Sequence, residues 1–217
     1  MFEWPKFAAH LCGEGSPEDR LTSLLSELSE PLPSAPEVKE VLEALFDEAL
    51  VNALQPYAAR LHHVGFLAPP GLALPAVDVV VAASPFRERR RTFKSAILAK
   101  DLSARVGRDV DVYVVNGCTS SRLVRCPEVE VFVVELPPAE LEVVVRQEIG
   151  SHVALELAAN ASFEDILDSL HAHQCWELPL MRRGPLTNRE IHSRVLYVDV
   201  APRGHTRRLE FIACDAP

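Results

Sequence analysis

The sequence lacks any apolar stretch that could cross a membrane. No part of the 217-residue chain approaches the roughly 18 uninterrupted apolar residues that a spanning helix needs. The first residues, MFEWPKFAAHLCGEG, contain one lysine and no apolar core of about 7–15 residues, so they do not have the pattern of a signal peptide. We therefore expect a cytoplasmic protein that does not bind a membrane.

The sequence also lacks a disulfide framework. Its five cysteines are odd in number, are irregularly spaced and include no C-x-x-C pair. This pattern is typical of reduced thiols in a reducing compartment.

Basic and aromatic residues are scarce. The formal net charge is −9, the sequence pI is about 5.4, and aromatic residues make up 6% of the chain. Broad binding to nucleic acids or anionic membranes needs a basic face, because affinity comes largely from neutralising phosphates. Nucleic-acid binding is therefore not expected, although a local basic patch leaves it open.

No complete catalytic signature is present. The sequence has no G-x-S-x-G elbow, Walker loop, G-x-G-x-x-G turn or H-E-x-x-H helix. Whether the protein is an enzyme stays open, and the missing signature weighs against it. No cofactor is expected.

What the sequence does contain is the composition of a globular protein, with 48% hydrophobic and 24% charged residues. The patterns predict an α/β (α+β) fold with an acidic helical region (1–62), an α/β core (63–136) and a strand-rich region with one helix (137–217), which could together form one compact domain. The last region is compatible with a β-grasp-like arrangement. No internal repeat is visible in the sequence.

Helix signals are clearest near the two ends of the chain. Ser16 precedes Pro17 and two acidic residues, which is a strong helix start, and leucines follow at helical spacing. A second helix is predicted to begin at Ser34. Ser162 and Asp165 form a capping box at the start of a later helix.

The centre of the chain predicts a strand–helix–strand unit over residues 77–115. The apolar run 77–83 indicates a buried strand, 86–106 a helix that ends at a glycine, and 109–115 a second strand. A right-handed crossover would place both strands in one parallel or mixed sheet.

The last third of the chain predicts mostly strands. Residues 176–193 have the composition of a loop. The predicted strands cover 129–135, 141–147 and 153–157, followed by a hairpin of 194–200 and 207–214.

Residues 41–116 resemble the minimal nucleotidyltransferase domain of the polymerase-β superfamily. A helix leads into the apolar segment 63–67, a Gly/Pro loop follows, and then come the strand 76–81, a helix and a second strand. In that family three carboxylates on these strands hold two magnesium ions. The resemblance implies that Asp78 and Asp111 would be metal ligands.

The active site of that family is incomplete in this sequence. Ala76 stands where the first carboxylate is expected, and Phe66 stands where the family has a serine after its glycine. Loss of one carboxylate normally abolishes two-metal chemistry. The scaffold would therefore be degenerate, and magnesium is expected only if it is active after all.

A dense basic stretch is the first candidate binding site. At the start of the predicted helix it could bind an anion or phosphate, helped by the helix N-terminus. It could also meet the acidic helices of 1–62 or an acidic partner, and a protein contact is the favoured interpretation. Its members are Arg87, Arg89, Arg90, Arg91 and Lys94.

A polar loop follows the predicted strand 109–115, at the position where open α/β sheets bind ligands. It comprises Asn116, Thr119, Ser120, Ser121 and Arg122.

An H-x-H-x-C pattern at a predicted helix end offers possible zinc ligands. A second pair of ligands at suitable spacing is not evident, so metal binding there stays open. Its members are His171, His173 and Cys175.

These observations lead to three hypotheses of function. The first is a non-catalytic interaction or regulatory subunit, a pseudoenzyme on the degenerate scaffold that binds a protein partner or a second copy of itself. The second is a metal-dependent nucleotidyltransferase or nucleotide-binding protein. The third is a nucleic-acid accessory factor that uses the arginine-rich regions.

Overall fold

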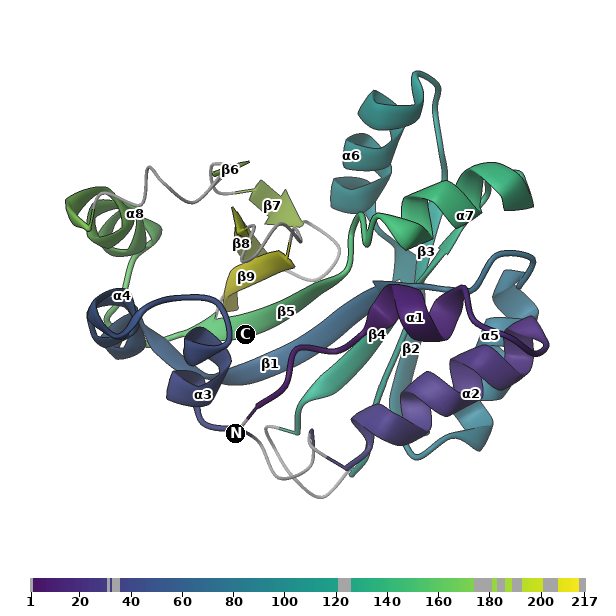
Figure 1. The fold of residues 1–217 in the computed structure, drawn as a ribbon, viewed down its shortest axis with the longest axis horizontal. Helices are drawn as coiled ribbons and strands as arrows, with labels where there is room; N and C mark the ends of the chain where they lie inside the picture. Colours follow the sequence, from purple (N-terminus) through teal and green to yellow (C-terminus); the bar gives the residue numbers. More distant parts are fainter. Residues whose placement is uncertain are drawn as a thin grey trace. The chain divides into compact units, whose positions relative to one another are not determined.

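The computed structural model describes residues 2–30, 32, 36–120, 126–173, 181–182, 186–188, 193–200 and 207–214 (Figure 1). The chain forms two compact units, each assembled from separate segments. We call residues 5–34 and 63–151 the central unit, and residues 1–4, 35–62 and 152–217 the terminal unit.

The sheet of the central unit has the order β2-β3-β4-β1. β1 pairs with β4 in parallel, whereas β4 with β3 and β3 with β2 are antiparallel pairs. The strand bounds are β1 (Ala58–Leu67), β2 (Glu88–Lys94), β3 (Val112–Cys118) and β4 (Glu128–Val134). The first residues of β1 belong to the terminal unit, and its part from His63 onward belongs to the central unit.

Helices cover one face of this sheet. Phe7 of α1 stacks on Phe66 of β1 with ring centroids 5.7 Å apart, and α5 packs on β3 and β4. α1 also packs on α2 and α7, and α2 on α5, as Figure 1 shows. The helices are α1 (Phe7–Leu11), α2 (Pro17–Leu28), α5 (Leu74–Ala83), α6 (Ala96–Val106) and α7 (Pro138–Arg146).

The opposite face of the sheet carries polar side chains. Side chains alternate along a strand, so the residues of β4 that flank Val129 and Val131 point away from the helices. These residues include Glu128 and Glu130, on a strand that is otherwise apolar. A buried strand with carboxylates on one face is unusual and positions the site described below.

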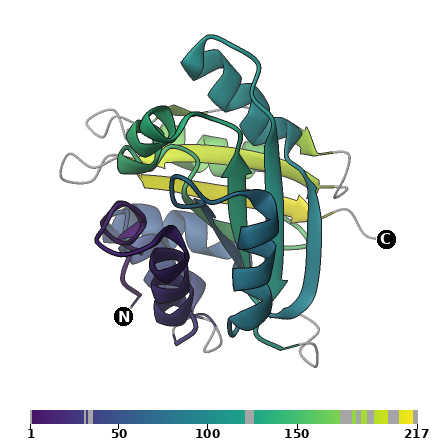
Figure 2. The same cartoon turned by 90° about the vertical axis from the view of Figure 1, so that its right-hand side faces the viewer.

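The terminal unit repeats this topology. β5 (His152–Leu157) pairs in parallel with β9 (Arg207–Cys214), and β9 is antiparallel to β8 (Ser193–Val200). In Figure 2 the two strands of the last hairpin run side by side in yellow. β8 also pairs antiparallel with two short strands, β6 (Met181–Arg182) and β7 (Leu186–Asn188).

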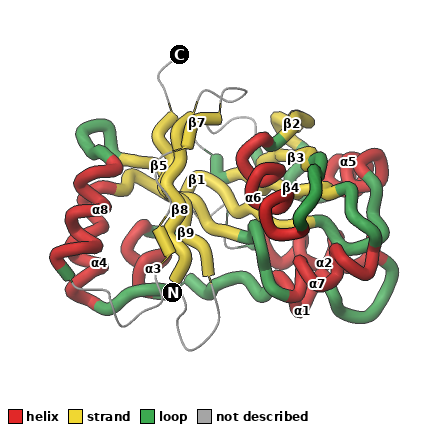
Figure 3. The backbone as a smooth tube through the Cα atoms, turned by 90° about the horizontal axis from the view of Figure 1, so that it is seen from above, coloured by secondary structure: helices red, strands yellow, loops and turns green. Residues whose placement is uncertain are grey.

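Helices complete the terminal unit. α4 packs against α8 and against α3, and Figure 3 shows α4 and α8 in red beside the strands. These elements are α3 (Val38–Glu43), α4 (Glu48–Leu54), the short 3-10 helix η1 (Gln55–Tyr57) and α8 (Phe163–Ala172). In both units a strand is followed by a helix and antiparallel strands, and the last strand returns beside the first in parallel.

The α/β (α+β) fold class is confirmed. Helix α2 begins after Ser16, whose side chain accepts a hydrogen bond from the Asp19 backbone N–H at 3.1 Å. The capping box of Ser162 and Asp165 is present at α8. The predicted hairpin is formed by β8 and β9.

The predicted strand 77–83 is wrong, because this segment is helix α5. Pro75 stands in the first turn, and Val77 and Val81 are buried one helical turn apart while Val79 between them is 66% exposed. Burial at i and i+4 marks a helix, and a run of valines hides this period because almost every position is apolar.

The predicted helix 86–106 is also wrong in its first half, which forms β2. Ser95 ends the strand and caps α6 by accepting a hydrogen bond from the Leu98 backbone N–H at 3.3 Å. β2 and β3 are antiparallel, so the predicted parallel crossover is absent from this part of the chain. The predicted strand 141–147 falls in α7.

The predicted second helix is two short helices, α3 and α4, separated by the cap residue Asp47. The predicted loop 176–193 includes β6 and β7, and its other residues from 176 to 192 lie outside the described part of the chain. Among the described residues, no helix has the length and apolar character that a membrane crossing requires.

We expect Gly117→Ala to destabilise the protein strongly. A Cβ at Gly117 would lie 2.0 Å from the Phe86 carbonyl oxygen, so the chain leading into β2 must move away from β3. We expect a loss of roughly 3 kcal/mol in the free energy of unfolding, measured by urea denaturation.

Gly107→Ala is the matched control. A Cβ there meets no atom within 4 Å, and only the left-handed φ of 73° opposes the substitution. The expected loss is about 1 kcal/mol. Equal losses for the two variants would contradict the close packing of β3 against the residues before β2.

Candidate functional site

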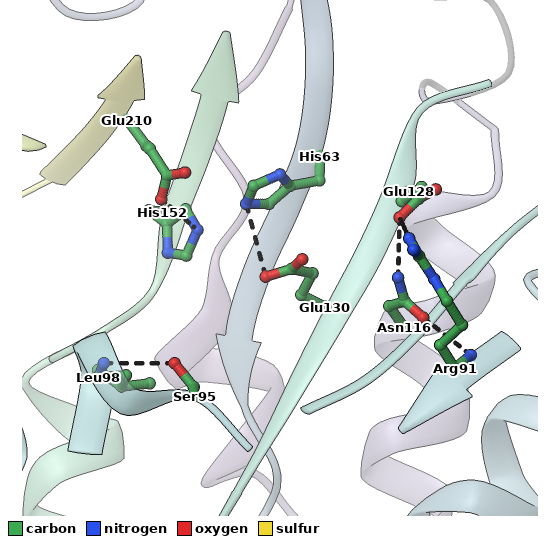
Figure 4. Close-up of polar contacts among 9 residues, drawn as sticks. All are labelled: His63, Arg91, Ser95, Leu98, Asn116, Glu128, Glu130, His152 and Glu210. Carbon is green, nitrogen blue, oxygen red and sulfur yellow. Dashed lines mark hydrogen bonds and ion pairs between the residues drawn. The ribbon is translucent and has the colours of Figure 1, made fainter. Parts of the chain in front are cut away.

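A histidine and a glutamate lie side by side on the parallel strands of the central unit (Figure 4). The Nε2 atom of His63 on β1 is 3.7 Å from Oε2 of Glu130 on β4. Their side chains are only 2% and 13% exposed. Both groups have therefore been removed from water without forming a close hydrogen bond to one another.

Burial decides the charge of this pair. It lowers the pKa of His63 to about 3, and it raises the pKa of Glu130 to about 7, against the opposing effect of the Arg91 charge. At neutral pH the imidazole is neutral and the carboxyl group is close to half-ionised. His63 and Glu130 are therefore not a stable ion pair, because burial disfavours both charged forms.

The terminal unit holds a second pair of the same kind. Nε2 of His152 on β5 is 3.2 Å from Oε2 of Glu210 on β9, and both side chains are 4% exposed. Tyr197 of β8 meets the His152 ring edge-on at 5.9 Å between centroids. Arg208 lies over the Tyr197 ring and donates to Asp199 at 2.5 Å. The second pair is thus held in a buried polar network.

The two pairs occupy the same register in the two units. Glu130 is the strand partner of Gly65, which lies two residues after His63. Glu210 is the strand partner of Ala154, which lies two residues after His152. Residues two apart on a strand share a face, so each histidine meets its glutamate along the same diagonal.

Imidazole nitrogen and carboxylate oxygen are common ligands of divalent transition metals. A buried carboxylate without a cation costs free energy, and a bound ion would offset that cost. In each unit, the histidine and the glutamate together can therefore present one nitrogen and one oxygen ligand to a cation.

The central unit extends its polar face beyond the pair. The Arg91 backbone N–H donates to Oδ1 of Asn116 at 2.9 Å, and Nδ2 of Asn116 donates to Oε2 of Glu128 at 2.9 Å. Arg91 Nη2 lies 3.6 Å from the same carboxylate oxygen. Burial raises the pKa of Glu128, while Arg91 opposes that rise. These residues continue the polar row across β2, β3 and β4.

The structure places the two predicted magnesium ligands elsewhere. Asp78 is on α5, where Oδ1 accepts a hydrogen bond from Arg90 Nη1 at 2.8 Å. Asp111 precedes β3, and its Oδ1 is 3.4 Å from Lys94 Nζ. Within the described residues, neither aspartate belongs to a group of three or more potential metal ligands. Metal binding by Asp78 and Asp111 stays an untested prediction.

The predicted basic cluster lies in and just before strand β2, so the expected helix N-terminus is absent from it. Neighbouring side chains of a strand point to opposite faces, and the cluster is divided accordingly. Arg90 reaches α5, whereas Arg91 reaches Glu128 on β4. Arg87 precedes the strand and is exposed, and Arg89 has a positive φ of 50°.

The predicted polar loop is divided between strand and loop. Asn116 lies in β3 and is buried, and Thr119 Oγ1 is 3.3 Å from Cys126 Sγ. Ser120 follows at an intermediate exposure, whereas Ser121 and Arg122 lie outside the described residues. Ligand binding by this loop remains a prediction.

The H-x-H-x-C pattern is only partly described. His171 is in the last turn of α8, and His173 follows it with Nδ1 2.9 Å from the Ser169 carbonyl oxygen. Both histidines are exposed, and Cys175 lies outside the described residues.

Sequence reasoning missed all four members of the two pairs. These four residues lie in strands that are rich in apolar residues but also contain other ionisable side chains. An ionisable residue in a largely apolar strand was the available signal. Nothing in the sequence indicated that these four segments form two equivalent pairs.

The comparisons with known proteins are distant. Neither a protein-family model nor a curated protein matches this sequence. A variant of Streptomyces coelicolor methylmalonyl-CoA epimerase, in complex with 2-nitronate-propionyl-CoA, is 15% identical with a TM-score of 0.42, covering 73% of this chain and 99% of that one. Mycobacterium tuberculosis methylmalonyl-CoA epimerase is 12% identical with a TM-score of 0.44, and the match covers 74% of this chain and 91% of that one. A mutant of Streptomyces coelicolor 4-hydroxymandelate synthase is 11% identical with a TM-score of 0.43, and the match covers 75% of this chain and 50% of that one.

The resemblance to nucleotidyltransferases is wrong. The solved structures similar to this chain are named epimerases and a synthase. The geometry agrees with this correction, because Asp78 is on a helix where the resemblance requires a strand. The hypotheses built on that scaffold, including the non-catalytic pseudoenzyme, are overturned together with it, because the strand–helix–strand unit on which they rest is not formed.

We expect Glu130→Gln to stabilise the metal-free protein at alkaline pH. The native pKa of Glu130, about 7, lies above its ordinary value of 4.5, so its contribution to stability is present below pH 4.5 and is lost as pH rises through 7. The wild type should lose about 2 kcal/mol relative to the variant between pH 5.5 and pH 8, at about 1.36 kcal/mol for each pKa unit.

Urea denaturation in the presence of a chelator measures this difference. Glu135→Gln is the control, because Glu135 is an exposed residue just after β4. A parallel pH dependence of the wild type and Glu130→Gln would show that Glu130 is ionised normally.

Proposed function

We propose that this protein is a metal-dependent enzyme. A divalent transition-metal ion would be held by the histidine and the glutamate of such a pair, His63 with Glu130 or His152 with Glu210. The single observation that carries this proposal is the repeated diagonal of a buried histidine and a buried glutamate on equivalent parallel strands.

The ligand types support a metal over a purely structural role. The His63 and Glu130 ligand atoms are 3.7 Å apart, and those of His152 and Glu210 are 3.2 Å apart. Each His–Glu pair alone supplies only two ligands, whereas transition-metal sites in proteins use three or four. Water or substrate oxygens would complete the coordination at each pair.

The donor set also favours catalysis. Structural zinc sites are closed, four-coordinate and usually rich in cysteine, whereas catalytic sites combine histidine and carboxylate with a position left for water or substrate. An ion bound in this way acts as a Lewis acid that polarises a substrate oxygen or lowers the pKa of bound water. The surrounding apolar strands would keep bulk water from that ion.

Location and assembly stay predictions of the sequence. A cytoplasmic location is supported by the cysteines, because Cys12, Cys118 and Cys126 are free thiols. A protein partner or a second copy of the chain is also still expected.

We expect the purified protein to bind a divalent transition-metal ion. Metal content after dialysis against Mn²⁺, Co²⁺ or Zn²⁺ can be measured by mass spectrometry, and affinity by calorimetry. His63→Ala or His152→Ala should each weaken binding by about 100-fold or more, because even losing a group that only supports a ligand costs 10–100-fold.

The double variant His171→Ala/His173→Ala is the control, since both residues are exposed histidines outside the two pairs. It should bind the ion like the wild type. Two ions per chain, with each pair variant losing only one, would show that the pairs act separately. Loss of the ion in the control, or no ion in the wild type, would contradict the proposed function.

A further inference from the structure

The guanidinium group of Arg91 is the most exposed member of the polar row in the central unit. Its side chain is 62% exposed, whereas Glu128 is 20% exposed and Asn116 is almost fully buried. In Figure 4 the Arg91 side chain runs beside Glu128 and Asn116. The base of this row is thus enclosed by protein, and its charged end is open to solvent.

The backbone of Arg91 is anchored. Asn116 uses both ends of its amide, accepting from the Arg91 N–H and donating to Glu128. A register shift between Glu88 and Arg91, with a left-handed φ of 50° at Arg89, interrupts the pairing of β2 with β3 just before Arg91. Such bulges re-aim side chains and often occur next to active sites.

Arg91 retains capacity to bind an anion. A guanidinium carries five N–H donors in a planar fork that matches a carboxylate. Its contact with Glu128 is 3.6 Å, which is longer than a hydrogen bond. By contrast, the adjacent Arg90 hydrogen-bonds both the side chain and the backbone carbonyl of Asp78 on α5.

Arg91 lies on the same sheet face as the proposed metal ligand Glu130. Its strand partner is Asn116, whose own partner on β4 is Glu130. Two strand spacings separate the backbones, about 10 Å, and the side chains of all three residues share one face.

We infer that Arg91 binds a carboxylate of the substrate, and that the substrate is a small acid with a second oxygen group directed toward Glu130. This inference rests on the proposed function, because that second group would be the one bound to the metal. Glu128 then has a defined effect: its carboxylate competes with the substrate for the guanidinium, so it limits affinity for anions.

The test is the binding of malonate, succinate and glutarate to the metal-loaded 217-residue protein. Calorimetry gives the affinity, and the visible spectrum of the Co²⁺ form shows whether the acid reaches the ion. We expect at least one of these acids to bind at millimolar concentration or below. Arg91→Met should weaken its binding by tenfold or more, because a charge-assisted bidentate contact is lost.

Two further variants separate an anion site from a structural role. Arg90→Met removes the same charge on the opposite face and should leave binding unchanged. Glu128→Gln removes the competing carboxylate and should strengthen binding several-fold. If the contact between Arg91 and Glu128 only maintained the fold, Arg91→Met and Glu128→Gln would both weaken the binding of the acid.

The outcomes distinguish this inference from the proposed function. If the protein binds one metal ion but none of the acids, or if Arg91→Met and Arg90→Met weaken binding equally, the inference is wrong and the metal site stands. If the protein binds no metal, the proposed function fails. Acid binding to metal-free protein that Arg91→Met still abolishes would then support the anion site alone.

Discussion

The parallel pairing of the first and last strand in each unit is the constraint on which the candidate site depends. A parallel pair cannot be closed by a tight turn, so the chain must leave the sheet and return through a long crossover. In the central unit, helices and two antiparallel strands fill that crossover between β1 and β4. The same path brings β9 back beside β5. A histidine on the outgoing strand therefore meets a glutamate on the returning one.

Burying these ionisable side chains lowers the stability of the fold. His63 and Glu130 are both buried, and burial suppresses the charge of each instead of joining them in an ion pair. A sheet face packed with valines would be more stable than one with these groups. Polar residues that oppose stability in this way are typical of functional positions, where proteins depart from their best packing.

Both units contain the same buried histidine–glutamate pair, although no repeat is visible in the sequence. The strands around His63 and His152 share little beyond apolar character, and the units differ in their intervening helices. What they share is the register, in which each glutamate pairs with the residue two positions after the histidine. Register is set by pairing across the sheet, so it is conserved between the units even where residues are not.

Sequence reasoning succeeded where the signal is local. The caps at Ser16 and Ser162, and the hairpin of β8 and β9, depend on residues close together in the chain, and each was predicted. It failed at the apolar segments α5 and α7, because runs of valine fit a strand and a buried helix equally well. Packing of α5 on the sheet, rather than β propensity, decided its conformation.

Short-range patterns in the chain were enough to establish a globular composition, several helix starts and the α+β class. The site depends on the tertiary structure. His63 and Glu130 lie far apart in the chain, and each stands in a strand that also contains other ionisable residues. Their meeting depends on which strands pair and in what register, and that choice is made by the packing of the whole sheet.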